Sequence, residues 1–364
     1  MARKYDMHLV DLLKQREVKS SYKGLEVTIK RLPDLDEDGA MDPRLYEDSK
    51  EMIKAMELVP ASALKMDASK EGLANLRESF NGIKSVPVVE SKINIQEHRV
   101  ETEPGVFCNV YQYTDEYTKP TDPVLYYIHG GGFFAGHHGV VEESLKLFCE
   151  KFHFPIFSVD YCLAPEHPYP SGHEDVYAVL KWIYKNGKEL KIDPEKIFVA
   201  GDSAGGNLAQ YCSTKDRDDH EHKVKGQMLL YPTLNMCGIE DEFFKWDISF
   251  YDMIPSQKNA LSKMINMFGQ MSSGLTSLLN IADAHDDYLN PYSMKDVQHM
   301  PATFVTVGEH DYLKVETLAW GAKLHANHVP VRAMIYNGLG HAYFDNCGVY
   351  PQCEDCIEEM GQLC

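Results

Sequence analysis

A serine with small neighbours stands where an apolar run meets a helical pattern. The run KIFVAG covers 196–201, and the pattern GDSAG occupies 201–205. A serine on so tight a strand-to-helix turn needs small neighbours, and the turn exposes its hydroxyl above the sheet. The following helix directs its positive N-terminal end at the same point. These features predict that Ser203 is a nucleophile and disfavour the alternative of a chance GxSxG pattern in a loop.

A serine hydroxyl becomes a good nucleophile when a base removes its proton. Two partners follow Ser203 along the chain: Asp311 comes after the run TFVTVG (303–308), and His341 after VRAMIY (331–336). Both residues stand just past strand-like runs, at the edge where the carboxyl ends of parallel strands meet. We therefore expect His341 to be the base and Asp311 to hold its imidazole.

Other acids and histidines compete for these roles, since the chain has 16 histidines. Glu309 and His310 lie within two residues of Asp311, and a surface or packing role is expected for His310. His325 and His328 fall in a helix-to-strand connection and are expected to be solvated. Position after a strand, in order behind Ser203, distinguishes His341 from this background.

Three glycines after a strand-like run could supply backbone donors. HGGG occupies 129–132, directly after VLYYI (124–128). Acyl transfer places negative charge on a carbonyl oxygen, which preformed N–H groups stabilise. The expected donors are the N–H groups of Gly131, Gly132 and Ala204, and His129, Gly130 and Asp202 support the two motifs. A phosphate-binding loop is excluded because its lysine is missing.

Strands and helices must alternate to position these residues. Further apolar runs at 155–161 and 226–232 join those above, and several are apolar throughout, as in parallel strands covered on both faces. Helical patterns separate them; in one, the apolar residues Val176, Val179, Leu180 and Ile183 share a face. A parallel sheet covered by helices is therefore expected.

Three blocks give the chain a resemblance to the hormone-sensitive-lipase-like branch of the α/β-hydrolases. They are HGGGF (129–133), DYCLAPEHPYP (160–170) and GDSAGGN (201–207), and the acid block GEHDYL and the histidine block NGLGHAYF match more loosely. The resemblance spans about residues 122–345. It implies an α/β-hydrolase fold, with a mostly parallel eight-stranded sheet, flanking helices and a helical cap.

The same resemblance implies the activity. Many members are acetyl esterases and short-chain carboxylesterases that need no cofactor and no metal, so a small ester, acetyl to hexanoyl, is the expected substrate. The chain departs from the family pattern at three places: Cys162 replaces the usual Arg, Val315 an acidic residue, and Ala342-Tyr343 the usual Gly-Phe. These departures leave the catalytic groups intact and bear on substrate preference.

The chain divides into three expected parts. Residues 1–85 are expected to form an N-terminal helical cap segment, with one helix starting at Asp42-Pro43. Residues 86–346 form the catalytic domain, with a cap insertion at about 236–290 rich in Met and aromatic residues, from Phe243 to Met271. Residues 347–364 are a cysteine-rich tail containing Cys347, Cys353, Cys356 and Cys364. For this tail a packed or frayed segment with reduced thiols is expected, and a zinc or redox site is the alternative.

Two other functions stay open. Plant gibberellin receptors resemble the family but lack the catalytic histidine, whereas Ser203, Asp311 and His341 are all present here. A peptidase or amidase on the same fold is also compatible with these residues. Labelling by a fluorophosphonate separates the first alternative from an esterase, and comparison of ester with anilide substrates separates the second.

Composition excludes several partners. The formal charge of −19 disfavours nucleic acid and anionic lipid surfaces. No apolar run approaches the roughly 20 residues of a membrane span, and charges interrupt the basic N-terminus before a signal-like apolar region. We expect a cytoplasmic protein whose partner is a small-molecule ester. A homodimer stays open.

Overall fold

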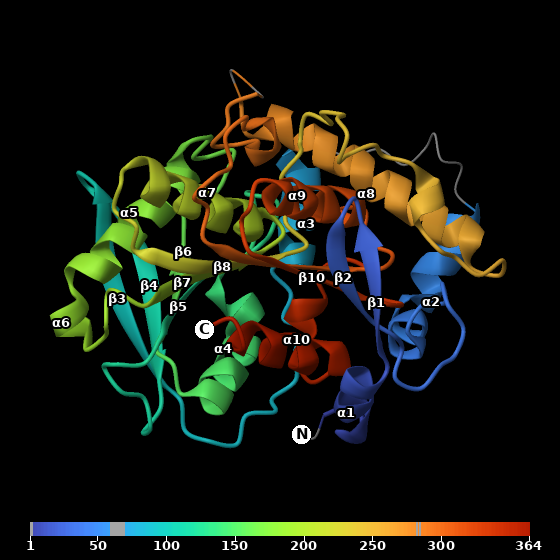
Figure 1. Ribbon diagram of the computed structural model, residues 1–364, viewed down its shortest axis with the longest axis horizontal. Coiled ribbons are helices and arrows are strands. Elements are labelled where there is room, and N and C mark those ends of the chain that lie inside the picture. The colour runs from blue at the N-terminus through green and yellow to red at the C-terminus, as the bar shows by residue number, and fades with distance from the viewer. Residues whose placement is uncertain (1–2, 59–69, 282, 284) are drawn as a thin grey trace.

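The protein is described here from a computed structural model that covers residues 3–58, 70–281, 283 and 285–364. Within the helices, the side chains of 55–58, 70 and 270–278 are outside the described part, and these include that of Met271. One sheet runs through the molecule, with helices on both of its faces (Figure 1). None of the described helices combines the length and the apolar character that crossing a bilayer requires.

The sheet has ten strands, and its central part is parallel. Its order is β1-β2-β10-β9-β8-β7-β5-β6-β4-β3. The pairs β1–β2, β3–β4 and β4–β6 are antiparallel, and the other neighbouring pairs are parallel. The strands are β1 (Glu17–Tyr22), β2 (Leu25–Lys30), β3 (Asn94–Glu103), β4 (Val106–Thr114), β5 (Val124–Ile128), β6 (Ile156–Asp160), β7 (Ile197–Asp202), β8 (Val224–Leu230), β9 (Ala302–Gly308) and β10 (Val331–Tyr336). The predicted apolar runs coincide with β5 to β10, so the α/β-hydrolase fold with a mostly parallel sheet is confirmed.

Helices cover the sheet on both faces. In Figure 1, α4 (His138–Phe152) and α10 (Pro351–Gly361) lie below the sheet, and α5 (Ser171–Lys185), α7 (Ala204–Asp218) and α9 (Lys314–Ala326) lie above it. The apolar face predicted for α5 is buried. Every residue of β5 and β7 is also buried, because helices pack on both sides of these strands.

The sheet has two more strands than the eight expected, and both lie in the segment expected to be helical, 1–85. β2 reads LEVTIK, and Leu25, Val27 and Ile29 alternate with polar residues, as is typical of a strand. Thr28 and Lys30 on its other face are also buried. Lys23 and Gly24 join β1 to β2 with φ of 50° and 89°, the positive values of a tight two-residue hairpin. The hairpin adds an edge to the sheet, so residues 17–30 correct the prediction.

The rest of the N-terminal segment is helical where it is described. The short α1 (His8–Gln15) precedes the hairpin, and α2 (Pro43–Leu58) and α3 (Lys70–Phe80) follow it. Asp42 accepts a hydrogen bond from the backbone N–H of Arg44, so α2 starts as predicted. The insertion at 236–290 contributes η2 (Ile248–Phe250) and the long α8 (Lys258–Leu278). Met41, Ile53, Ala260 and Leu261 form a small cluster that joins α2 to α8. Residues 59–69, 282 and 284 of the two expected cap segments lie outside the described part.

The C-terminal segment is packed rather than frayed. η4 (Tyr343–Asn346) leads into α10, where Cys353 and Cys356 are fully buried. None of the nine cysteines is in a disulfide bond. Among the described residues, the tail cysteines Cys347, Cys353, Cys356 and Cys364 belong to no group of three metal-ligating side chains, so the alternative of a zinc site in the tail has no support. The short α6 (Gly187–Leu190) and η3 (Pro291–Ser293) complete the fold.

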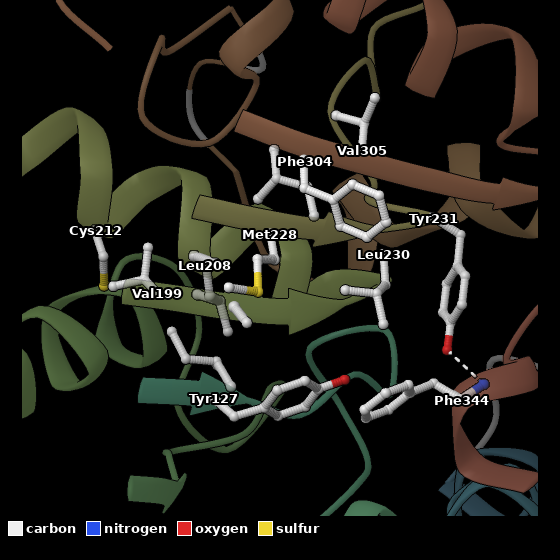
Figure 2. Packing of buried hydrophobic residues seen from close by; sticks show 14 of the residues in the cluster. Tyr127, Val199, Leu208, Cys212, Met228, Leu230, Tyr231, Phe304, Val305 and Phe344 are labelled. Atoms are coloured by element: carbon white, nitrogen blue, oxygen red, sulfur yellow. Dashed lines mark hydrogen bonds between the residues drawn. The ribbon is translucent and has the colours of Figure 1, made fainter. Parts of the chain in front are cut away.

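The core lies between the central strands and the helices, and it reaches the end of η4. Figure 2 shows Tyr127 from β5, Tyr231 just after β8 and Phe344 from η4 close together. The rings of Tyr127 and Phe344 are stacked 5.3 Å apart, and the Phe344 N–H donates to Tyr231 Oη over 3.2 Å. This packing fixes the segment that follows residue 341 against the sheet.

Candidate active site

The GDSAG segment makes a strained turn between β7 and α7. Ser203 has φ 54° and ψ −119°, a conformation that L-residues adopt only where the surroundings impose it. A Cβ on Gly201 would lie 2.2 Å from the carbonyl oxygen of Gly205, and one on Gly205 would lie 2.1 Å from that of Ile128. The turn therefore needs both glycines, which is the physical reason for the sequence pattern around Ser203.

Ser203, His341 and Asp311 form a continuous hydrogen-bonded chain, although 138 residues separate the first two. His341 Nε2 lies 2.9 Å from Ser203 Oγ, and His341 Nδ1 lies 2.8 Å from Asp311 Oδ2. Since an ionised carboxylate only accepts, Nδ1 carries the proton and Nε2 is free to accept from the hydroxyl. The loops after β7, β9 and β10 bring the three residues together at one edge of the sheet.

The electrostatics of His341 favour proton uptake. Burial disfavours the imidazolium, but the charge of Asp311 and its hydrogen bond outweigh it, so the pKa of His341 is raised. Asp311 is completely buried, and its second oxygen accepts from the Leu313 N–H over 2.9 Å. The arrangement can accept a proton from Ser203 and stabilise the resulting cation.

The HGGG loop follows β5 and lies beside the turn. Gly131 and Gly132 have φ of 115° and 61°, and a Cβ on Gly131 would lie 2.1 Å from the carbonyl oxygen of Ala135. Within the described residues, no protein acceptor engages the N–H groups of Gly131 and Gly132. Ala204 is the first residue of α7, where backbone N–H groups lack helical partners. These groups are therefore available to an anionic oxygen.

Asp202 links the loop to the turn. Its Oδ1 accepts from the Gly130 N–H and from the Tyr127 hydroxyl, each over 3.0 Å. Burial raises the pKa of Asp202 to about 6. His129 donates through Nδ1 to the Gly130 carbonyl, and burial lowers its pKa to about 4, so its ring is neutral. His129 and Asp202 thus hold the loop through the backbone of Gly130.

Residues outside the predicted motifs also hold this loop. Arg77 on α3 donates to the carbonyls of Phe134 and Ala164, each over 2.7 Å, and Asn81 accepts from the Gly136 N–H over 2.8 Å. The first ~85 residues carry no motif that points to this role. Arg77 is far from these carbonyls along the chain, so its role leaves no local pattern in the sequence.

The loop after β9, which carries Asp311, is held by the insertion at 236–290. Tyr251 Oη donates to the Tyr312 carbonyl over 3.1 Å, and Lys314 Nζ donates to the Phe250 carbonyl over 2.9 Å. His310 Nε2 lies 3.0 Å from the Asp252 carbonyl oxygen, which fixes its role as packing rather than surface. Burial lowers the pKa of His310 to about 4.

The remaining competitors lie elsewhere. Glu309 accepts from the Gly338 N–H over 2.8 Å, and burial raises its pKa to about 7. His325 and His328 are exposed, as predicted. No described hydrogen bond joins Ser203 to any of these residues, so His341 is the histidine that the structure brings to the serine.

Aromatic rings surround His341. Its ring centroid lies 4.9 Å from that of Tyr231 and 5.1 Å from that of Tyr312. Tyr312 in turn stacks on Phe268 of α8, with centroids 5.8 Å apart. From the expected Met and aromatic cluster, Phe244 and Tyr251 are buried whereas Trp246 and Phe250 are exposed, so the segment does not act as one uniform lining.

Two buried carboxyls near the site escaped sequence reasoning. Burial raises the pKa of Asp345, on η4, to about 7, and that of Glu316, on α9, to about 7. Glu316 accepts from the N–H groups of Leu234 and Asn235, over 2.7 and 3.3 Å. An acid in a helix or a loop looks exposed in a sequence, because its burial depends on distant segments.

A separate cavity of about 940 Å³ lies along the C-terminal half of α7. Thr214, Arg217, Tyr288, Tyr292 and Lys323 contribute to its lining. None of Ser203, Asp311 and His341 lines it. The geometry of the hydrogen-bonded chain, and not this cavity, marks the candidate active site.

Known proteins resemble this chain over much of its length. The sequence profile of the α/β-hydrolase fold matches residues 125–345. Esterase LipI of Mycobacterium tuberculosis is 27% identical over 87% of this chain and 92% of its own length. Carboxylesterase NlhH of the same species is 28% identical over 77% of this chain and 85% of its own.

Solved structures show the same fold. An arylesterase structure has a TM-score of 0.70 at 21% identity and covers 89% of this chain and 98% of its own. The esterase of Pyrobaculum calidifontis has a TM-score of 0.67 at 23% identity and covers 88% and 97%. The chain therefore belongs to the α/β-hydrolase family, in its hormone-sensitive-lipase-like branch.

Proposed function

We propose that this protein is a serine carboxylesterase that cleaves esters of short acyl chains through an acyl-enzyme, with Ser203, His341 and Asp311 as its catalytic residues. The coarser statement, that it is a carboxylic-ester hydrolase, follows from its family and from the esterases it resembles over most of its length. The single observation that carries the finer proposal is the hydrogen-bonded chain from Ser203 Oγ to Asp311 Oδ2.

The first half of the reaction forms the acyl-enzyme. His341 Nε2 takes the proton of Ser203 as Oγ attacks the ester carbonyl, and Asp311 stabilises the imidazolium. The N–H groups of Gly131, Gly132 and Ala204 receive the negative oxygen of the tetrahedral intermediate. As the intermediate collapses, the bond to the alcohol oxygen breaks and His341 returns its proton to that oxygen. Ser203 is left carrying the acyl group.

The second half releases the acid. His341 takes a proton from water, and the hydroxide attacks the acyl carbonyl under the same donors. The bond to Ser203 Oγ then breaks, and the proton on His341 returns to the serine. These proton transfers are internal to the site, so the mechanism needs no metal or cofactor in any step.

The substrate part of the proposal rests on the aromatic residues beside the base. Tyr312 lies against His341 on one side and against Phe268 of α8 on the other. A ring fixed between the base and the insertion takes up room that a long acyl chain would need. We therefore propose acyl groups from acetyl to hexanoyl.

The decisive experiment is Ser203→Ala. Turnover of p-nitrophenyl acetate should fall by more than about 10⁴-fold, since removing the nucleophile of such a triad is that costly. Wild-type protein should be labelled stoichiometrically by a fluorophosphonate, and the variant should not. Ser213→Ala is the matched control, because Ser213 is buried on α7, which follows Ser203, and donates to the Ala209 carbonyl.

Retained turnover in Ser203→Ala would contradict the proposal, and a folded wild type that is neither labelled nor active would favour a binding role. Amide hydrolysis is a second candidate for one reason. Arylacetamide deacetylase of Oryctolagus cuniculus is 34% identical over 132 residues, although these are 35% of this chain and 33% of its own. Turnover of p-nitroacetanilide at a rate equal to that of p-nitrophenyl acetate would support that candidate.

A further inference from the structure

Two thiols and a carboxylate from three separate elements meet outside the Ser203 site. Cys108 belongs to β4, Cys162 follows β6 by two residues, and Asp175 lies on α5. Their Sγ atoms and a carboxylate oxygen are all within 4.8 Å of one another. Among the described residues, no other three His, Cys, Asp or Glu side chains bring their ligand atoms this close together. Cys108 and Asp175 are buried, whereas Cys162 is partly exposed, so the cluster can be reached from the side of Cys162.

The carboxylate of Asp175 is oriented but not neutralised. One oxygen accepts from Thr102 Oγ1 over 2.6 Å, and the other accepts from the Cys162 N–H over 3.0 Å. Asp175 is only 3% exposed and also contacts the Cys108 thiol, but no ion pair with a lysine, arginine or histidine is found for it in the described part of the chain. Buried carboxylates are ordinarily paired with a cation or bound to a metal. The cluster therefore has a place for a positive charge.

We propose that Cys108, Cys162 and Asp175 bind a thiophilic divalent cation of the Zn²⁺ type, with water in the fourth position on the side of Cys162. Zinc binds thiolates at about 2.3 Å in a tetrahedral arrangement, which sets two bound sulfurs about 3.8 Å apart. That separation is within the 4.8 Å limit of the cluster. Thr102 does not bind the cation itself; its hydrogen bond fixes the direction of the Asp175 carboxylate.

Charge and protons balance in this step. Before binding, two neutral thiols and one carboxylate carry a charge of −1. After binding, two thiolates, one carboxylate and a divalent cation again carry −1, and two protons have gone to solvent. The contact with Cys162 and burial both raise the pKa of the Cys108 thiol. Affinity should accordingly rise with pH.

The site would join segments that support the Gly131 loop. Tyr161, next to Cys162, donates to the His129 carbonyl over 3.0 Å and stacks on its ring. A little further on, the Ala164 N–H donates to the Phe133 carbonyl over 2.9 Å. A cation that ties Cys162 to β4 and α5 should therefore raise the Tm, while ester hydrolysis does not depend on it chemically.

Cobalt provides the test, because Co²⁺ occupies zinc sites and its bonds to thiolate absorb in the near ultraviolet. Reduced, metal-free full-length protein should bind one Co²⁺ per chain with this absorption, and Zn²⁺ should displace it. Cys162→Ser should lose the absorption, whereas Cys237→Ser, at another partly exposed cysteine, should keep it. Thr102→Val keeps all three ligands and should weaken Zn²⁺ binding by about 10- to 100-fold.

Retained thiolate absorption in Cys162→Ser would overturn the proposal, as would its absence in the reduced wild type. A disulfide between Cys108 and Cys162 is the competing outcome. It would appear as a mass lower by two hydrogens that reductant restores, with no Co²⁺ absorption in the reduced protein. Wild-type turnover of p-nitrophenyl acetate by Cys162→Ser and Thr102→Val would show that both variants are folded.

Discussion

His341 lies between a carboxylate and a hydroxyl, and its protonation decides whether Ser203 can be activated. Its pKa is raised because the charge of Asp311 outweighs the burial that opposes protonation. Two further buried carboxyls, Asp202 and Asp345, act on it in the same direction. The base must be neutral to take a proton, so kcat/KM should rise with pH through the raised pKa of His341. The midpoint of this acidic limb is expected above about 6.5, the ordinary value for histidine.

Asp345→Asn tests the origin of that pKa. Because burial raises the pKa of Asp345 to about 7, this carboxyl carries its negative charge only in part near neutral pH. Removing that charge destabilises the imidazolium, so the pKa of His341 falls slightly and the acidic limb of kcat/KM moves to lower pH. Glu26→Gln, at an exposed carboxylate on β2, should leave the profile unchanged. A limb that stays in place in Asp345→Asn would show that this carboxyl does not act on the base.

Tyr312 controls acyl length in the proposed reaction. Its ring stands between His341 and Phe268, so Tyr312→Ala should open this place to longer chains. With p-nitrophenyl esters from acetate to decanoate, wild-type kcat/KM should be highest at or below hexanoate, and the variant maximum should move to longer esters. Tyr117→Ala, at an exposed tyrosine, is the control. A wild-type maximum beyond octanoate would refute the short-chain proposal.

At the scale of elements, α3 contacts the Gly131 loop. Arg77 donates to the carbonyls of Phe134 and Ala164 and also pairs with the exposed Glu166. Arg77→Ala should lower kcat about tenfold, because misaligned N–H donors stabilise the transition state less well. KM should change little, because the substrate in its ground state depends less on these donors. Glu166→Gln removes only an exposed ion pair and should change neither constant. Equal loss in both variants would place the effect in the ion pair.

The insertion at 236–290 holds the loop that carries Asp311 in place through hydrogen bonds. Residues 250–252 hold Tyr312, Lys314 and His310 through one hydrogen bond each. Both segments expected to cap the site are thus joined to the loops that carry its chemistry. This supports the proposal that the two segments act as one cap.

Across the whole molecule, a buried ion cluster joins the two ends of the chain. Lys30 on β2 is fully buried and pairs with Asp355 and Glu359 on α10. Lys30→Met would leave the buried Asp355 without its cation, whereas Glu359 would keep its ion pair with Arg332. The free energy of unfolding should therefore fall by about 3 kcal/mol. Lys54→Met removes an exposed pair with Glu51 and should cost less than about 1 kcal/mol. Urea denaturation measures both, and equal stability of the two variants would contradict the prediction.

The sequence by itself determined the parts of this protein whose causes are local. The glycine at 201 is required by a contact with the Gly205 carbonyl within the turn, so the pattern revealed the turn. The apolar runs of β5 to β10 reflect burial on both faces, so they revealed the parallel sheet. The order of Ser203, Asp311 and His341 after successive strands followed from these elements.

Only the tertiary structure decided what depends on residues far apart in the chain. The β1–β2 hairpin became an edge of the sheet because β10 was free to pair with β2. Arg77, Tyr251 and Asp345 show ordinary types and positions in the sequence, and their roles come from partners that folding brings to them. The same holds for Cys108, Cys162 and Asp175, since three side chains without a shared motif become a cluster only when strands and a helix pack together.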